Sequence, residues 1–142
     1  MTNTRPFHLA FPVNDLDAAR DFYGRVLACP QGREDARWID YNLYGHQIVA
    51  HLDTDLARPA AIKNAVDGDA VPVPHFGVVL TFAQFDELQQ RLEADSDIHW
   101  VIKPRVRFSG QAGEQRTMFL LDPAGNALEF KAFADDSMLF AS

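Results

Sequence analysis

An internal repeat constrains the fold of this chain more than any other feature of its sequence. Residues 1–53 and 73–134 each follow the order strand, helix, strand, strand, strand. Each repeat opens with a strand-like alternation that carries one histidine, His8 in the first and His75 in the second. The strand hairpins after the helices argue against a ferredoxin-like α+β barrel. The pattern therefore predicts an α+β fold made of two similar modules.

The chain is expected to form a single domain, 1–142, because 142 residues suffice for one sizeable core. The first module spans 1–53 and the second 73–134. Residues 54–72 are rich in Ala, Asp, Asn, Gly and Pro and are interpreted as a connector or surface loop. The tail, 135–142, ends in apolar residues and is expected to dock on the body or on a partner subunit.

The first module is expected to begin with a strand at Pro6–Val13. Asn14 is predicted to cap the helix that follows. Residues 29–33 are expected to form a loop, which leads to two strands at 38–44 and 47–52. The apolar face of the first strand is predicted to be Phe7, Leu9, Phe11 and Val13.

The second module repeats this order, starting with a strand at Pro74–Leu80. Thr81 and Gln84 form a capping box ahead of the second helix. An Asp-Pro-x-Gly turn precedes the last strand, 126–133, in which Glu129 points away from its apolar neighbours. The remaining strands are predicted at 98–102 and 117–121, with 106–108 extending or following the first of them.

Composition and charge narrow the class of protein. With 13 basic and 20 acidic residues the net charge is −7, which argues against nucleic acid or an anionic membrane as partner. A small molecule or another protein is expected instead. The single cysteine, Cys29, excludes a disulfide framework, a zinc ribbon and dithiol chemistry. The chain contains no long apolar run and starts without a signal-peptide pattern, so a cytoplasmic location is expected.

Two histidines and one carboxylate are the candidate metal ligands: His8, His75 and Glu129. Each is two residues from a small residue on the same strand face, and these small neighbours are interpreted as leaving open volume around the polar groups. Two imidazoles and a carboxylate suit a divalent metal with open positions, as in the 2-His-1-carboxylate sites of non-haem iron. An ordinary core or surface role for each histidine is the alternative interpretation. The small neighbours are Ala10, Gly77 and Ala127.

Four further residues are candidates for the same site. His51, in the strand at 47–52, has three possible roles: a fourth ligand, an acid or base beside the metal, or part of a cavity wall. Arg107, Gln115 and Arg116 flank a glycine-containing loop. They are interpreted either as substrate-binding residues that grip an anion or as solvated loop residues.

These features together resemble one family. The matching segments are the strand with His8, the helix sequence at 15–27, the strand with His75, and the Asp-Pro-x-Gly-Asn-x-Leu-Glu run that ends at Glu129. They resemble the vicinal oxygen chelate superfamily, the glyoxalase, bleomycin-resistance and extradiol dioxygenase group. The whole pattern is most similar to single-domain relatives described as predicted extradiol dioxygenases.

The resemblance implies both architecture and site. Two βαβββ modules would form an incompletely closed mixed β-sheet around a central cavity, with the helices outside, usually in a homodimer. His8, His75 and Glu129 would be the metal ligands. His51 lies near the position where glyoxalases place a further carboxylate, which argues against a glyoxalase assignment.

The leading functional hypothesis is an extradiol-type ring-cleaving dioxygenase that acts on a small catechol-like or vicinal-oxygen substrate. Its cofactor is expected to be Fe(II) or Mn(II), and His51 is the expected acid or base. The first alternative is a glyoxalase-like isomerase or lyase that uses Zn(II), Ni(II) or Co(II). The second alternative is a non-enzymatic, resistance-type protein that binds a small molecule. Neither nucleic acid nor membrane is expected as a partner.

Overall fold

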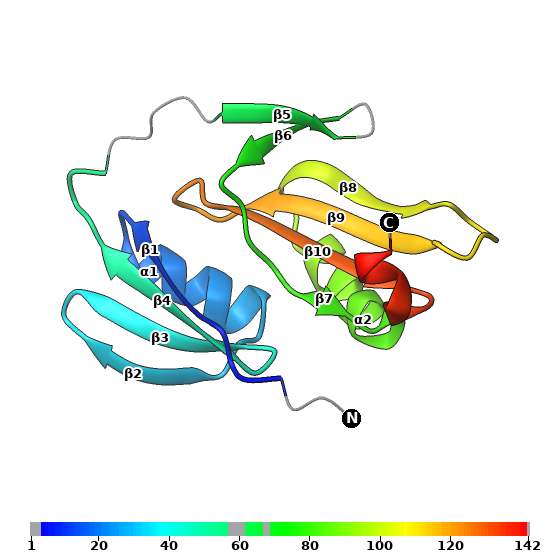
Figure 1. The fold of residues 1–142 in the computed structure, drawn as a ribbon. Helices are drawn as coiled ribbons and strands as arrows, with labels where there is room; N and C mark the ends of the chain where they lie inside the picture. The colour runs from blue at the N-terminus through cyan, green and yellow to red at the C-terminus, as the bar shows by residue number, and fades with distance from the viewer. Residues whose placement is uncertain (1–3, 57–61, 67–68, 142) are drawn as a thin grey trace. The chain divides into compact units, whose positions relative to one another are not determined.

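The structure, a computed structural model, describes residues 4–56, 62–66 and 69–141. Within these residues the strands form two four-stranded sheets and one two-stranded hairpin (Figure 1). Both four-stranded sheets are mixed, and a helix packs on each, so the expected α+β class is confirmed.

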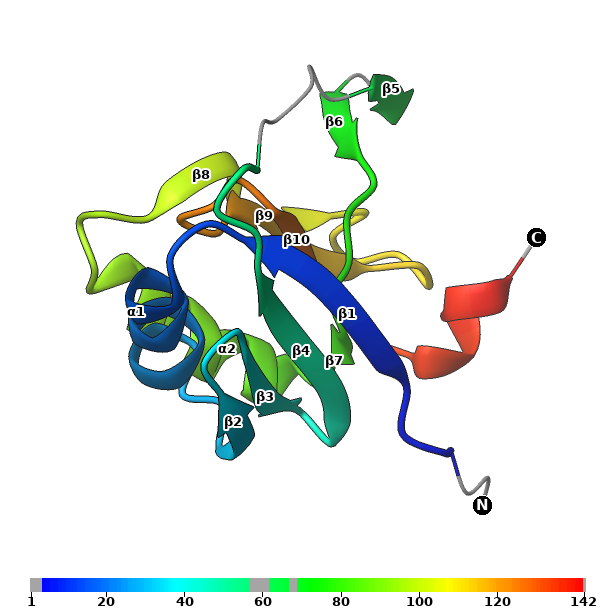
Figure 2. The same cartoon turned by 90° about the vertical axis from the view of Figure 1, so that its left-hand side faces the viewer.

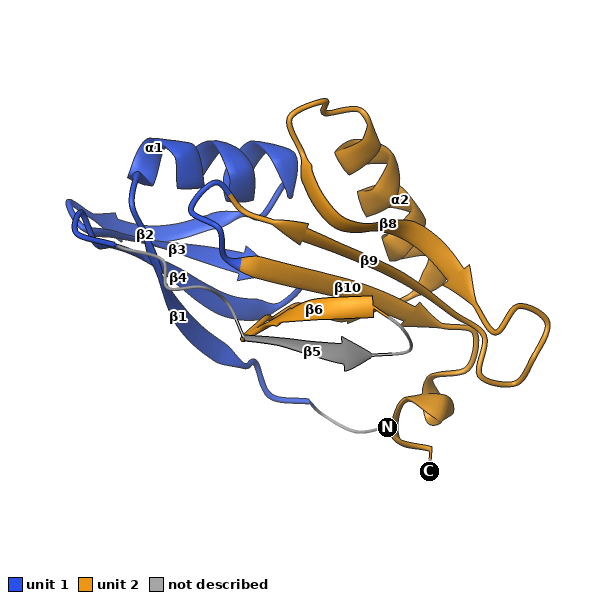
Figure 3. Ribbon diagram, turned by 90° about the horizontal axis from the view of Figure 1, so that it is seen from above, with its two compact units in different colours: residues 1–58, 123–126 blue, residues 59–122, 127–142 orange. Residues whose placement is uncertain are grey.

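The chain divides into two compact units, which are coloured separately in Figure 3. Unit 1 comprises residues 1–58 and 123–126, and unit 2 comprises residues 59–122 and 127–142. Within unit 1, the side-chain amide of Asn126 donates to the backbone carbonyl of Pro12, with an N–O distance of 2.9 Å.

The sheet of unit 1 has the strand order β1-β4-β3-β2. Strand β1 runs parallel to β4, beside which it lies in Figure 2, and the other pairs are antiparallel. The parallel register pairs His8 with Gln47 and Pro12 with His51. The four strands are β1 (His8–Val13), β2 (Gln31–Asp35), β3 (Trp38–Leu43) and β4 (His46–Leu52).

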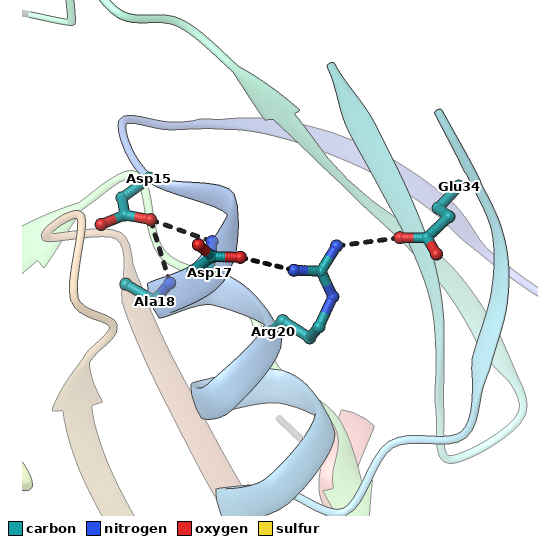
Figure 4. Close-up of polar contacts among 5 residues, drawn as sticks. All are labelled: Asp15, Asp17, Ala18, Arg20 and Glu34. Atoms are coloured by element: carbon teal, nitrogen blue, oxygen red, sulfur yellow. Dashed lines mark hydrogen bonds and ion pairs between the residues drawn. The ribbon is translucent and has the colours of Figure 1, made fainter. Parts of the chain in front are cut away.

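The helix of unit 1 consists of α1 (Leu16–Ala19) and a π-helical continuation, η1 (Arg20–Val26). The predicted cap at Asn14 is wrong by one residue, because Asp15 is the N-cap. The Asp15 carboxylate accepts hydrogen bonds from the backbone N–H groups of residues 17 and 18, at 2.9 and 3.2 Å (Figure 4). These bonds satisfy donors that the first helical turn leaves unpaired.

Arg20 connects this helix to the edge strand β2. Its guanidinium donates to Asp17 at 2.7 Å and to Glu34 of β2 at 2.9 Å (Figure 4). The hydrogen bond to Glu34 raises the pKa of Arg20. Residues 29–33 were expected to be a loop, but β2 begins at Gln31. All five residues of β2 are exposed and none is apolar, so no hydrophobic alternation marks this strand.

Aromatic side chains fill the core of unit 1 between sheet and helix. The ring of Tyr23 lies 5.3 Å from that of Phe11, 4.9 Å from Phe22 and 5.8 Å from Tyr41, measured between centroids. Tyr41 is 1% exposed, and burial raises the pKa of its phenol. Its hydroxyl group has no hydrogen-bond partner in the described part of the chain.

The predicted apolar face of the first strand is partly wrong. Phe11 and Val13 are buried and Leu9 is half-buried, but Phe7 is 66% exposed. Phe7 lies just before β1, where its backbone N–H donates to Nδ1 of His46 at 2.8 Å. The alternation in the sequence therefore begins one residue before the strand does.

The sheet of unit 2 has the order β7-β10-β9-β8, with β7 parallel to β10 and the other pairs antiparallel. Helix α2 (Phe82–Glu93) is capped by Thr81, and the predicted capping box with Gln84 is confirmed. Its buried side chains are Phe85, Leu88 and Leu92. The strands are β7 (Val79–Leu80), β8 (His99–Arg107), β9 (Gln115–Leu121) and β10 (Ala127–Phe133).

The structure shortens one predicted strand and extends another. The strand predicted at Pro74–Leu80 is reduced to β7 and an isolated parallel bridge between Phe76 and Leu128. Of the two alternatives for 106–108, extension of the strand at 98–102 is confirmed, because both belong to one continuous strand, β8, which accommodates Pro104 through register shifts. The tail contains a 3₁₀ helix, η2 (Asp136–Phe140).

Part of the predicted connector is regular structure. Strands β5 (Ile62–Val66) and β6 (Asp69–Val73) form an antiparallel hairpin, while 57–61 and 67–68 lie outside the described residues. The sequence of this segment has no clear strand pattern. Its contact with the rest of unit 2 is tertiary, because Val71 of β6 is buried against Phe119 and Ala127. None of the helices in the described ranges has the length and apolar character that crossing a membrane requires.

Candidate metal and substrate site

His75 and Glu129 come together in unit 2. Nε2 of His75 lies 3.6 Å from Oε1 of Glu129, and the side chains are 30% and 21% exposed. Glu129 is in the middle of β10, where Leu128 and Phe130 point to the opposite face and are fully buried. The predicted division of this strand into a packed face and a carboxylate face is therefore confirmed.

Backbone hydrogen bonds hold the His75 segment against β10. The N–H of Phe76 donates to the carbonyl of Ala127 at 3.1 Å, and the N–H of Glu129 donates to the carbonyl of Phe76 at 2.8 Å. Because successive side chains alternate between faces, His75 emerges on the same face as Glu129. Two backbone bonds thus place an imidazole beside a carboxylate that is distant in the sequence.

Gly77 has a different role from the predicted one. A Cβ atom at this position would lie 1.6 Å from the backbone oxygen of Glu129. The missing side chain therefore permits close approach of two backbones, and the interpretation that it leaves cavity volume is wrong. Gly77 acts on the site indirectly, by allowing the segment with His75 to lie against β10.

The ring of His75 has a fixed orientation. Its Nδ1 lies 2.7 Å from the backbone carbonyl of Pro72. A carbonyl can only accept, so in the neutral imidazole Nδ1 carries the proton and Nε2 keeps its lone pair toward Glu129. The ring also meets Phe119 edge to face, with centroids 4.8 Å apart. Metal-ligating histidines are commonly held in this way through their second nitrogen.

Lys131 is a neighbour that the sequence analysis did not identify. Its ammonium nitrogen lies 3.6 Å from the same Glu129 oxygen that faces His75. The strand period of two places Lys131 on the face of Glu129, so this signal was present in the sequence. A divalent cation on Glu129 would compete with this ammonium group.

The predicted substrate-binding residues lie on both faces of the sheet. Thr117 pairs with Lys131, two residues from Glu129 on β10, and Gln115 pairs with Phe133, four residues from Glu129. Arg107 pairs with Gln115. Gln115 and Arg107 therefore share the Glu129 face. Arg116 lies on the other face, where it bonds Asp86 of α2 and covers the ring of Phe82 at 4.1 Å. The structure therefore brings Arg107 and Gln115 to the face of the candidate site and Arg116 to the helix.

His8, in unit 1, is oriented through two side chains. Its Nδ1 lies 2.8 Å from Oε1 of Gln47, and Nε2 of Gln47 donates to Asp40 at 3.3 Å. The Asp40 carboxylate can only accept, so the amide nitrogen of Gln47 faces Asp40 and its oxygen faces His8. In the neutral ring Nδ1 of His8 then carries the proton, as in His75, and Nε2 keeps its lone pair.

His51 is exposed on β4, where it pairs with Pro12 of β1 and Trp38 of β3. Register partners share a face, so His51 lies on the same face of the unit 1 sheet as His8. The predicted ligand triad draws His8 from unit 1 and the other two residues from unit 2. Among the residues that the structure describes, no group of three His, Cys, Asp or Glu side chains is close enough to hold a metal ion.

The donor chemistry nevertheless fits a divalent metal. His75 and Glu129 offer an imidazole nitrogen and a carboxylate oxygen that face each other, and the second nitrogen of the ring is already bonded. His8 offers the same kind of donor in the same tautomer. Imidazole and carboxylate are ligands for iron, manganese, zinc, nickel and cobalt alike, so the donor set admits a metal without selecting one.

Comparison with solved structures finds close relatives of this fold. A glyoxalase/bleomycin resistance protein/dioxygenase from Alicyclobacillus acidocaldarius is 34% identical, with a TM-score of 0.77 over 99% of this chain and 100% of that one. A fosfomycin resistance protein, FosX, from Listeria monocytogenes is 15% identical, with a TM-score of 0.68 over 96% and 99%. A lactoylglutathione lyase from Agrobacterium tumefaciens is 19% identical, with a TM-score of 0.62 over the full length of both chains.

The latter two likenesses show the fold alone, because identity is low. No curated protein matches the chain. The family model described as the Glyoxalase/Bleomycin resistance protein/Dioxygenase superfamily matches residues 5–130, which include all three predicted metal ligands. The chain belongs to this superfamily, the vicinal oxygen chelate proteins.

Proposed function

We propose that this protein is a metal-dependent enzyme in which His8, His75 and Glu129 would hold one divalent metal, Fe(II) or Mn(II). One observation carries the proposal: in both histidines Nδ1 is occupied by an acceptor, so Nε2 is the nitrogen left for a ligand bond. The two histidines occupy equivalent positions in the two modules. Members of the superfamily bind divalent metals, and these residues supply donors for one.

The proposed reaction is extradiol-type ring cleavage of a small catechol-like diol. The bound metal would supply a template and Lewis acid for the adjacent oxygens of the substrate and for O₂. Phe119, 1% exposed, would present an apolar surface beside the imidazole of His75. His51 would accept a hydroxyl proton of the diol, because a neutral imidazole is a competent base near pH 7.

The first test is metal content. Protein purified without a chelator is expected to contain about one iron or manganese per chain by mass spectrometry, while His75→Ala and Glu129→Ala lose the metal and stay folded. His99→Ala is the matched control, since His99 is an exposed residue at the start of β8 outside the proposed ligand set. Full metal occupancy in His75→Ala or Glu129→Ala would contradict the ligand assignment.

The second test is oxygen consumption with catechol, measured with an electrode. Uptake that is lost in Glu129→Ala supports the dioxygenase. His51→Ala is expected to keep its metal and lose turnover if His51 is the base, or to lose metal affinity if it is a ligand. Zinc, nickel or cobalt in place of iron, without oxygen uptake, would favour an isomerase or lyase.

A second candidate function is supported by Lys131. This ammonium group lies 3.6 Å from Glu129 and would offset the carboxylate charge in a protein that holds no metal there. Protein that remains free of metal after incubation with each of the five ions would support this non-enzymatic binding protein. For both candidate functions the expected binding partner is a small molecule. We also propose that the chain acts as a homodimer.

A further inference from the structure

The two imidazoles of the proposed ligand set face acceptors of different kinds. Nδ1 of His75 faces the backbone carbonyl of Pro72 at 2.7 Å, and a carbonyl can only accept. Nδ1 of His8 faces the side-chain amide of Gln47 at 2.8 Å, and an amide has an acceptor at one end and a donor at the other. The tautomer of His75 is therefore fixed by the backbone, whereas that of His8 depends on which end of the Gln47 amide faces the ring.

The amide of Gln47 lies between His8 and two residues of β3. Gln47 of β4 pairs with His8 of β1 and with Asn42 of β3, so the three side chains share one face. Asp40 is two residues from Asn42 on the same strand and lies on the same face. Nε2 of Gln47 donates to Oδ2 of Asp40 at 3.3 Å. An ionised carboxylate accepts and never donates, so this bond directs the amide nitrogen away from His8.

The surroundings of Asn42 and Asp40 support this assignment. The side-chain oxygen of Asn42 already accepts from the backbone N–H of Gly45 at 2.6 Å. Asp40 is half-buried, and a Cβ at Gly32 of β2 would lie only 3.2 Å from the Cβ of Asp40. The Asp40 side chain thus packs closely against the neighbouring strand. It presents a charged acceptor to Gln47 from a confined position, and hydrogen bonds to charged groups are stronger than those between neutral groups.

We propose that Asp40 is a positioning residue for the metal site: through Gln47 it keeps the proton on Nδ1 of His8 and leaves Nε2 free to bind a metal. This inference rests on the proposed function, in which Nε2 of His8 is a ligand atom. With the amide of Gln47 reversed, its NH₂ group would donate to Nδ1, the ring proton would be on Nε2, and that nitrogen would have no lone pair for a metal. A residue outside the proposed ligand set therefore decides whether the set is complete.

The test is the tautomer of His8 in metal-free protein, measured by NMR. Two-bond ¹H–¹⁵N correlation spectra of protein labelled with ¹⁵N-histidine distinguish Nδ1–H from Nε2–H, at about pH 9, far above the ordinary titration range of histidine. Wild type is expected to show the Nδ1–H form for both His8 and His75. Asp40→Asn, which hardly changes the size of the side chain, should show both tautomers of His8, because an amide at this position can donate as well as accept. The spectrum of His75 should not change.

A double variant, Asp40→Asn with Gln47→Glu, separates the orientation of the amide from a general structural effect. The carboxylate introduced at position 47 can only accept, so it should restore the pure Nδ1–H form of His8. Asp21→Asn is the matched control and should leave the tautomer unchanged, because it removes one negative charge from the helix of the same unit, where Asp21 pairs with Arg25. Unchanged Nδ1–H in Asp40→Asn, or persistence of Nε2–H in the double variant, would overturn the inference.

Calorimetric titration with Mn(II) distinguishes this inference from the proposed function. The apparent Kd should rise in Asp40→Asn as the Nδ1–H population falls, by at least about twofold when the two tautomers are equally populated. If wild type binds no Mn(II) while Asp40→Asn still changes the tautomer, the proposed metal site is wrong and the effect of Asp40 on His8 stands. Mn(II) binding by wild type, with no change of tautomer in Asp40→Asn, supports the proposed function and contradicts the inference.

Discussion

At the scale of single residues, the candidate site depends on two imidazole rings whose orientation is set by hydrogen bonds to neighbouring groups. Nδ1 of His75 is bonded to Pro72, and Nδ1 of His8 to Gln47, so the same ring atom is occupied in both modules. The supporting acceptor differs, since one is a backbone carbonyl and the other a side-chain amide held by Asp40. The same ring atom is therefore held by different kinds of acceptor in the two modules.

Gly77 provides a residue-scale prediction. Gly77→Ala would place Cβ 1.6 Å from the backbone oxygen of Glu129, so the Phe76–Leu128 bridge must shift. We expect a loss of about 2–4 kcal/mol in the free energy of unfolding, measured by urea denaturation, since backbone clashes are among the larger mutational effects.

Gly24→Ala is the control for this substitution. A Cβ at Gly24 would meet its nearest neighbour, a ring carbon of Tyr41, at an ordinary 3.8 Å. In a helix this change is expected to be neutral or to stabilise by up to about 1 kcal/mol. Equal effects of the two substitutions would show that close backbone approach at Gly77 does not matter.

At the scale of elements, side-chain bonds cap the helix of unit 1 and connect it to an edge strand. Asp15 caps α1, and Arg20 ties the same helix to the exposed edge strand β2 through Glu34 (Figure 4). Surface ion pairs of this kind contribute little stability by themselves. The sequence of β2 has no apolar face, and its position at the edge of the sheet follows from antiparallel backbone pairing with β3, to which the Arg20–Glu34 bond adds a contact from the helix.

The helix cap gives an element-scale prediction. Asp15→Ala should lower the free energy of unfolding by about 1 kcal/mol, because two backbone N–H groups lose their acceptor. Asn14→Ala, one residue earlier, should change it by less than about 0.5 kcal/mol. Both values come from thermal or urea unfolding monitored by circular dichroism. A larger loss of unfolding free energy in Asn14→Ala than in Asp15→Ala would show that Asn14 caps the helix.

At the scale of the whole molecule, the chain is two versions of one folding unit. Each unit has a four-stranded mixed sheet whose first strand is parallel to a later one, and each sheet has one helix on a face. The proposed ligands are distributed between the units, one from the first and two from the second. Both units are therefore required for the proposed chemistry.

The proposed homodimer is the prediction at this scale. Light scattering coupled to gel filtration is expected to give twice the mass of the 142-residue chain over a hundredfold range of concentration. Three exposed aromatic side chains are candidates for the contact between the two copies. They are Phe7, Phe108 and Phe140. A mass equal to one chain throughout this range would contradict the dimer.

Much of the fold follows from local pattern. The repeat, the helix stripe of α2 with its Thr81–Gln84 capping box, and the inward and outward alternation of β10 at Glu129 all depend on residues close in sequence. Such patterns state which face of an element is buried. They also suffice to name the two histidines and the carboxylate as candidates, since each is a polar residue within an alternating apolar pattern.

The tertiary structure decided the remaining features, because contacts between distant segments produce no periodic pattern in the sequence of either segment. The β5–β6 hairpin, the close approach at Gly77 and the bond from Gln47 to His8 depend on the register between strands. Register is set by packing and backbone hydrogen bonds across many residues of intervening chain. The sequence alone therefore determined the modules and the candidate ligands, while packing decided how those ligands are held and which cations accompany them.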